Sequence, residues 1–283
     1  MGPRYLVIVS DLDPVARAVL ERWGDRPATG SHVEGAAIRS LGDGVELLRR
    51  PGLHIHDERL DRLLPPHLLG VPLVFPSVHR STSGTPCTTV HPLGNFGGTE
   101  EVGGAARQLV PAPARLMAAT LRSLAESEPS TGLATTYEAT HHGPWLRAPG
   151  FFAEISHDPN GPPPSEAAVR ALADLLRGLR EDPTDRIVVG LGGGHYAPHF
   201  TDLALRRRWA FGHIVPRHAL ASEGAPAVRA AVGSTPGAEG VLYARAQDAE
   251  NVGPIDGAVR LRETGAEKRD PTGSPSSYRA AGT

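Results

Sequence analysis

Short apolar segments alternate along this chain with segments whose apolar residues recur at helical spacing. Residues 5–10 and 71–75 are apolar runs that predict strands, and further strands are expected at 135–139, 151–155, 186–191 and 240–244. Residues 111–128 and 165–179 predict amphipathic helices, the second capped by Ser165. Alternation of strands with helices favours helices on both faces of one sheet. We therefore expect an α/β fold with three layers, α/β/α, and a mixed central sheet.

Length, charge and cysteine content narrow the class of protein. The 283 residues fit one large α/β domain, which we expect over 1–267, followed by a disordered tail over 268–283. A net charge of −2 gives no overall basic field, which disfavours a DNA-coating protein and requires a local patch for any nucleic acid. The single Cys87 excludes an internal disulfide, and no long apolar run suggests a signal peptide or membrane span. These features predict a cytosolic protein without a membrane partner.

The most informative segment is the loop Gly192-Gly193-Gly194-His195-Tyr196, which directly follows the strand predicted at 186–191. Consecutive glycines permit positive φ, and their N–H groups can form a nest that binds an anion. His195 and His199 are four residues apart, a zinc-site spacing if the segment were helical, although Pro198 argues against a regular helix. A glycine turn with one hydrogen-bonded histidine is the structural alternative.

A second histidine segment, Glu138-Ala139-Thr140-His141-His142-Gly143-Pro144, lies at the end of another predicted strand. Adjacent side chains point in different directions on an extended chain, so one histidine can face a site while the other supports it. Glu138 has three possible roles: a general base, a partner to a histidine, or a buried acid paired with an arginine.

Further polar residues are candidates for binding a substrate. Glu154 lies on an apolar strand, where an unpaired carboxylate would be costly. His213 lies in a strand-like step, and a structural histidine is the competing reading. The remaining candidates are His79 with Ser81, His91 with Asn95, and Tyr196; a Ser-His nucleophile pair among them is conceivable, but the chain has no G-x-S-x-G motif.

A basic cluster, Arg206-Arg207-Arg208-Trp209, places three cations beside an indole. Such a combination can contact phosphates and stack on a base, so we expect these four residues to bind tRNA. A solvated helix face explains the same residues without any partner.

The order of the motifs resembles that of the archaeal and plant D-aminoacyl-tRNA deacylases. The resemblance covers roughly residues 4–265 and rests above all on THHGP at 140–144 and GGGHYAP at 192–198. It implies hydrolysis of the ester that joins a D-amino acid to tRNA, a fold similar to the phosphorylase and peptidyl-tRNA hydrolase group, and zinc. The chain departs from the pattern at 156–162 and at Phe96, where a tryptophan is common, so that edge of the pocket is expected to differ.

The resemblance and the residues together give a hypothesis for the site. Glycine N–H groups with His195 would stabilise the oxyanion, while His141 or His142 with Glu138 would orient water or zinc. We therefore expect catalytic residues at His195, His141, His142, Glu138, Gly193 and Gly194, and zinc ligands among His141, His142, His195 and His199. A zinc-dependent peptidase or amidohydrolase and a non-catalytic tRNA-binding module are the alternatives. The preferred D-amino acids, and whether the chain is a monomer or a homodimer, are not specified by the sequence.

Overall fold

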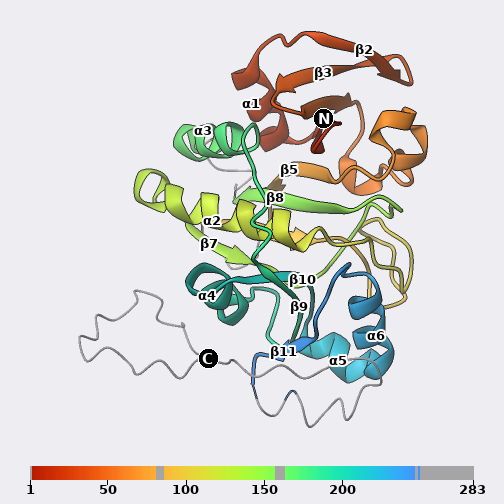
Figure 1. The fold of residues 1–283 in the computed structure, drawn as a ribbon, viewed down its shortest axis with the longest axis vertical. Helices are drawn as coiled ribbons and strands as arrows, with labels where there is room; N and C mark the ends of the chain where they lie inside the picture. Colours follow the sequence, from red (N-terminus) through yellow and green to blue (C-terminus); the bar gives the residue numbers. More distant parts are fainter. Residues whose placement is uncertain (1, 81–85, 157–162, 246–247, 249–283) are drawn as a thin grey trace.

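A computed structural model describes residues 2–80, 86–156, 163–245 and 248 of the chain, which form two sheets with helices against them (Figure 1). The larger sheet has the strand order β2-β3-β4-β1-β5-β8-β6-β7. Its strands are β1 (Tyr5–Ser10), β2 (Ala28–Val33), β3 (Ala36–Gly42), β4 (Val45–Arg50), β5 (Leu73–His79), β6 (Cys87–Pro92), β7 (Ala134–Tyr137) and β8 (Gly150–Ser156). Strands β4, β1, β5 and β8 are parallel neighbours, whereas β6 and β7 run the opposite way and β2 to β4 pair antiparallel. The sheet is therefore mixed, as predicted.

A smaller parallel sheet has the order β10-β9-β11, with β9 (Arg186–Leu191) between β10 (Trp209–Val215) and β11 (Val241–Tyr243). Backbone hydrogen bonds connect it to the larger sheet. The N–H of Ala139 donates to the carbonyl of His195 at 2.8 Å, and the N–H of Thr140 donates to the carbonyl of Ile214 at 3.0 Å. The segment that follows β7 is thus fixed against the segments that end β9 and β10.

Helices cover both sides of these sheets (Figure 1). One side holds α1 (Pro14–Trp23), α2 (Ala114–Thr131), α3 (Glu166–Leu175) and α4 (Pro198–Arg206). The other side holds three short 3-10 turns, η1 (His54–His56), η2 (Leu60–Leu63) and η3 (Pro66–Leu68), against the larger sheet, and α5 (Arg217–Glu223) and α6 (Ala225–Gly233) against the smaller one. The three-layer α/β/α prediction is confirmed. None of the described helices has the length and apolar character that crossing a membrane requires.

The core follows the alternation of side chains along the strands. On β1, Val7 and Val9 pack under α1 to α4, while Leu6 and Ile8 face the 3-10 turns. Successive strand residues point to opposite faces, so one strand contributes to two apolar layers. This explains why the central strands are apolar at nearly every position.

Local signals set the starts of α1 and α3, whereas the bounds of α2, predicted at 111–128, and the end of α3, predicted at 179, differ from the prediction by three or four residues. The Asp13 carboxylate accepts a 2.8 Å hydrogen bond from the N–H of Ala16 and caps α1, whose first residue is Pro14. Ser165 caps α3, as expected, by accepting from the N–H of Ala168. Each helix thereby begins with a partner for one of its free N–H groups.

One helix and three strands differ from the sequence prediction. Pro198 does not prevent a helix; it is the first residue of α4, a position at which the missing N–H costs nothing. The strands β2, β3 and β4 were not predicted, because their residues alternate weakly and include Gly, Ser and Arg. The tail over 268–283 lies outside the described residues, so the domain limit at 267 stays a prediction.

Candidate active site

Polar side chains emerge on one face of the larger sheet, from three neighbouring strands. The register pairs β5 with β8 so that Phe75 lies beside Phe152, and β6 places His91 opposite Phe152. Glu154 lies two residues beyond Phe152 and His79 four residues beyond Phe75, so by the alternation of side chains both occupy the same face as these aromatic rings. The polar site therefore begins where the apolar layer around Phe75 and Phe152 ends, on the face opposite α1, α2 and α3.

A second set of polar side chains lies where the two sheets meet. Glu138 is fully buried, and its Oε2 lies 3.6 Å from Nε2 of His141 and 3.5 Å from Nε2 of His195. Neither carboxylate oxygen of Glu138 has a hydrogen-bond partner among the described residues. His195 is about half exposed, so it connects this buried carboxylate with solvent. The structure thus brings together the two histidine segments that the sequence singled out.

Three imidazoles, those of His91, His141 and His142, lie against one another. Their ring centroids are 4.1 Å apart for His91 and His141, 4.8 Å for His91 and His142, and 4.5 Å for His141 and His142. In each ring Nδ1 donates to a backbone carbonyl: that of Pro92 at 3.2 Å, Ala139 at 2.8 Å and Gly143 at 2.8 Å, respectively. A proton on Nδ1 leaves the lone pair on Nε2, so all three rings can act as acceptors or ligands through Nε2.

Burial keeps two of these rings uncharged. It lowers the pKa of His141 well below its ordinary value and that of His142 to about 3, with the neighbouring His91 adding to both shifts. One ligand nitrogen from each of the three rings lies within 4.8 Å of the others. Neutral imidazoles whose other nitrogen is held by a backbone carbonyl are the usual donors to zinc. Nε2 of His91 is moreover buried without a hydrogen-bond partner among the described residues. The donor set therefore fits zinc.

His79 connects two buried carboxylates. Its Nδ1 lies 3.0 Å from Oε1 of Glu138 and 3.2 Å from Oε2 of Glu154, and its Nε2 lies 2.9 Å from the Tyr196 hydroxyl. With the proton on Nδ1, the tyrosine hydroxyl donates to Nε2. Tyr196 and His79 thus fix each other's orientation beneath His195, whose ring centroid is 5.9 Å from that of His79.

The two carboxyl groups titrate in opposite directions. Burial, with the charge of Glu154 beside it, raises the pKa of Glu138 to about 9. Burial alone would also raise the pKa of Glu154, but the hydrogen bond from His79 and the neighbouring imidazole of His91, whose Nε2 lies 3.7 Å from Oε1, outweigh it and hold that pKa well below its ordinary range. Two carboxyl groups this close do not both ionise freely, so Glu154 carries the charge and Glu138 the proton.

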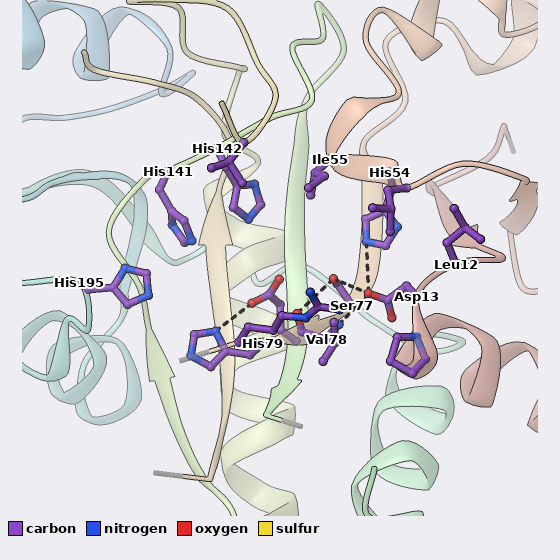
Figure 2. A pocket seen from close by; sticks show the side chains of 15 residues that line it. Leu12, Asp13, His54, Ile55, Ser77, Val78, His79, His141, His142 and His195 are labelled. Atoms are coloured by element: carbon purple, nitrogen blue, oxygen red, sulfur yellow. Dashed lines mark hydrogen bonds and ion pairs between the residues drawn. The ribbon is translucent and has the colours of Figure 1, made fainter. Parts of the chain in front are cut away.

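Two pockets open on either side of the imidazoles. The first, of about 350 Å³, extends from His79, His141 and His195 past Ser77 to Asp13 and His54 (Figure 2). The second, of about 360 Å³, extends from His141 and His142 toward α5 and is lined by Gly94, Asn95, Phe96, Thr140, His218 and Ser222 among others. Both pockets share His141, His142 and Val102. A molecule of two parts could occupy both, with its junction at the imidazoles.

The glycine loop beside His195 contains backbone N–H groups without a hydrogen-bond acceptor among the described residues. Gly192 and Gly193 have φ of +104° and +86°, which favours glycine. A Cβ at Gly193 or Gly194 would meet no atom within 4 Å, and no acceptor among the described residues takes the N–H of either. These two N–H groups, next to His195, therefore lack an acceptor in the described part of the chain, which is compatible with the predicted oxyanion role.

Three predicted residues have other surroundings. His213 is fully buried, donates through Nε2 to the carbonyl of Val110 at 2.9 Å and accepts through Nδ1 from Thr140 at 3.0 Å. Both ring nitrogens are thus occupied by the protein, so His213 positions the segment before His141 and does not contact a substrate. His199 lies on α4 and belongs to none of the described groups that could hold a metal, because Pro198 starts the helix beyond His195. Ser81 lies outside the described residues.

Asn95 lines the second pocket and holds its wall in place. Its Nδ2 donates a 2.9 Å hydrogen bond to the carbonyl of Gly103. A Cβ on Gly104 would lie 2.8 Å from the same Nδ2. Asn95 therefore shapes this pocket at least as much as it offers a contact to a substrate.

The basic cluster lies at the other end of the smaller sheet. Arg206 ends α4 and Trp209 begins β10, whereas His195 follows the end of the parallel strand β9. A six-residue strand spans about 20 Å, which separates the cluster from the imidazoles. Arg206 pairs with Asp202 and Arg208 with Asp182, and Trp209 is only 4% exposed. The indole is therefore not available to stack on a base, and any tRNA contact here would be remote from the reacting group.

The structure adds residues that the sequence did not single out. Asp13, His54 and Ser77 line the first pocket, and all three are buried. Asp13 stands just before α1, and His54 stands in a short polar segment without strand or helix periodicity. Their proximity depends on the pairing of β1, β4 and β5, which no local signal reveals.

Comparison with known proteins gives a family. The model of a family described as D-aminoacyl-tRNA deacylase matches residues 71–256. The curated D-aminoacyl-tRNA deacylase of Methanoregula boonei is 38% identical over 212 residues, which cover 74% of this chain and 45% of that protein. That of Methanosarcina mazei is 34% identical over 218 residues, which cover 74% of this chain and 71% of its own.

A solved structure supports the fold. A crystal structure described as a conserved protein of unknown function superposes with a TM-score of 0.75 at 24% identity, and it covers 89% of this chain and 91% of its own. The chain spans less than half the length of the first three curated relatives, at 45%, 38% and 36%.

Proposed function

Since this chain belongs to the D-aminoacyl-tRNA deacylase family, we propose that it hydrolyses the ester between a D-amino acid and the 3′ end of tRNA. The products are the free D-amino acid and a tRNA that can be charged again, a form of chiral proofreading. A substrate made during translation implies that the protein works in the cytosol.

The observation that carries this proposal is the cluster of imidazoles and carboxylates between two pockets. His141 and His142 line both pockets, so an ester that joins an aminoacyl group to a nucleoside can lie across them with its carbonyl at the cluster. The two parts of such a substrate have different shapes and chemistries, which two separate pockets accommodate. The more exposed His195 marks the side from which water and the tRNA end approach.

We propose that His91, His141 and His142 hold a zinc ion. When bound, zinc lowers the pKa of a water molecule toward neutrality and polarises a carbonyl group. His141 and His142 contribute by staying neutral, through burial, and all three rings direct Nδ1 to backbone carbonyls, which leaves Nε2 for the ion. His195, which the sequence suggested as a ligand, belongs to a separate group that could hold a metal, with His79 and Glu138, and His199 is on α4.

The remaining residues move the proton and bind the developing charge. Ester hydrolysis takes one proton from the attacking water and returns one to the 3′ oxygen that leaves. Glu138 carries a proton, and its Oε2 lies within 3.6 Å of Nε2 of both His141 and His195, where it can give that proton to the leaving 3′ oxygen and regain one from the attacking water. The N–H groups of Gly193 and Gly194, with His195, would donate to the carbonyl oxygen as it becomes negative.

The test is deacylation of D- and L-tyrosyl-tRNA by the purified chain, with and without prior chelation. We expect release of D-tyrosine at a rate well above that of L-tyrosine, and a large decrease for His195→Ala and His142→Ala. Near-parental rates in both variants would reject the assigned roles. Hydrolysis of peptides without action on aminoacyl-tRNA, or tight tRNA binding without turnover, would reject the function itself.

A further inference from the structure

His54 is a buried polar side chain without a hydrogen-bond partner in the described part of the chain. It lies on η1, its side chain is 1% exposed, and neither Nδ1 nor Nε2 has an acceptor or donor within hydrogen-bond distance among the described residues. The ring is stacked on Phe75 and Phe152, with centroids 5.9 and 5.1 Å away. A buried group left unsatisfied costs about 1–3 kcal/mol, so its persistence calls for a partner that is not part of the protein fold.

His54 lines the first pocket beside the Asp13 carboxylate (Figure 2). Nε2 of His54 lies 4.0 Å from Oδ2 of Asp13, too far for a direct hydrogen bond. Oδ2 is held in place by the Ser77 hydroxyl at 2.9 Å and the N–H of Val78 at 3.0 Å. Two acceptors that each bind the same ammonium at about 2.9 Å lie roughly 4–5 Å apart. The spacing of the two side chains suits one primary ammonium between them.

Charge and protonation favour the same ligand. No arginine or lysine in the described residues forms an ion pair with Asp13, so its charge is open to a cation from outside. Burial lowers the pKa of His54, which leaves the ring neutral at physiological pH. A neutral imidazole can accept a hydrogen bond at Nε2, as an ammonium requires.

The separation of His54 from the imidazole cluster is short enough for an aminoacyl group. The ring of Phe152 stacks on both imidazoles: its centroid is 5.1 Å from that of His54 and 5.2 Å from that of His91. The two imidazole centroids are therefore at most about 10 Å apart, so a ligand held by both must be small. The nitrogen and carbonyl carbon of an aminoacyl ester are only two bonds apart, which meets this requirement.

We propose that His54 and Asp13 bind the α-ammonium group of the aminoacyl ester and thereby determine its chirality. This inference rests on the proposed function and names the recognition of its substrate. With the ammonium fixed at one end and the ester at the other, the D and L enantiomers exchange their side chain and α-hydrogen. The apolar residues Leu12, Leu53, Ile55 and Val102, which line the same pocket, would receive the side chain of the D enantiomer.

The test compares D-tyrosyl-tRNA, N-acetyl-D-tyrosyl-tRNA and L-tyrosyl-tRNA as substrates of the full chain and its His54→Phe and His54→Gln variants. Phenylalanine keeps the stacking on Phe75 and Phe152 but cannot accept a hydrogen bond. A hydrogen bond to a charged group is worth about 1.5–3 kcal/mol, so we expect kcat/KM of His54→Phe to fall roughly 10- to 100-fold for D-tyrosyl-tRNA. The acetylated substrate, which has no ammonium, should change by less than about twofold, and the ratio of D to L rates should fall. The side chain of glutamine can accept a hydrogen bond, so His54→Gln should retain part of the kcat/KM that His54→Phe loses.

Each outcome separates this inference from the proposed function. An equal decrease for the free and acetylated substrates would show that His54 only supports the fold, and unchanged kinetics would show that it does not bind the substrate. Either result overturns the inference while the deacylase function stands. Parental protein that hydrolyses none of the substrates would reject the function and the inference with it. Melting temperatures of the three proteins, expected to agree within a few degrees, show that the variants are folded.

Discussion

Nδ1 of His213 accepts a 3.0 Å hydrogen bond from the hydroxyl of Thr140, the residue that precedes His141 in the chain. The same hydroxyl accepts from the N–H of Ile214 at 3.1 Å, and Nε2 of His213 donates to the carbonyl of Val110. The arrangement satisfies a neutral imidazole completely. These three hydrogen bonds hold Thr140, and with it the backbone immediately before His141, in place.

This relationship predicts a pH dependence of stability. Burial lowers the pKa of His213 to about 4, whereas an unfolded histidine titrates near 6.5. Between these values the unfolded state binds more protons, so the free energy of unfolding falls as the pH drops from 6.5 toward 4, by about 3 kcal/mol at most. Above pH 6.5 the contribution is constant.

The matched variant is His213→Gln, which keeps a donor for Val110 but does not titrate. We expect it to be less stable than the parent at pH 7, with a shallower loss of stability between pH 6.5 and 4. Urea unfolding at a series of pH values measures both. Identical slopes in the two proteins would contradict a neutral, buried His213.

Asp13 is expected to matter for stability as well as for the pocket. It caps α1 and also binds Ser77 and Val78, so Asp13→Ala leaves three donors without their partner. Loss of a cap and of buried hydrogen bonds costs about 1–3 kcal/mol. Asp11→Ala is the control: Asp11 pairs with Arg49 at the surface, and such pairs contribute at most about 1 kcal/mol. Denaturant unfolding measures the free energy of unfolding of both variants. Equal losses in Asp13→Ala and Asp11→Ala would contradict the assigned role of Asp13.

Gly143 allows two loops to cross closely beside His142. A Cβ there would lie 2.0 Å from the backbone nitrogen of Gly104, so Gly143→Ala must displace one loop. We expect a loss of about 1–3 kcal/mol in stability and a decrease in kcat, because His142 moves with its neighbour. Gly178→Ala, which meets no atom within 4 Å, should leave both unchanged. Activity and melting temperature measured together test this, and a fully active Gly143→Ala variant would show that the crossing does not position His142.

Zinc binding can be tested without measuring activity. We expect elemental analysis of the parent to find about one zinc per chain, and the His142→Gln variant to bind it at least about tenfold more weakly. His32→Gln removes an exposed histidine on β2 and should bind zinc as the parent does. Equal zinc contents in all three proteins would exclude His142 as a ligand.

The sequence by itself determined several of the strands and helices, and it showed that polar residues follow the ends of some of these strands. The strands at 5–10 and 186–191, the cap at Ser165 and the histidines after strand ends follow from alternation, helical spacing and capping, which act over a few residues. The motifs at 140–144 and 192–198 also identified the family, because a run of such specific residues can be recognised from residue order alone, without knowing how the strands pair.

Only the tertiary structure decided which of these residues meet. Glu138 reaches His195 because backbone hydrogen bonds connect the segment after β7 with the segment after β9, and His54 joins Asp13 because β1 lies between β4 and β5. The same topology places Arg206 and Trp209 at the far end of β10 and begins α4 at Pro198, which removes His199 from the imidazole cluster. Strand order is set by packing of whole faces between residues far apart in the chain, whereas the patterns in a sequence report only on neighbours.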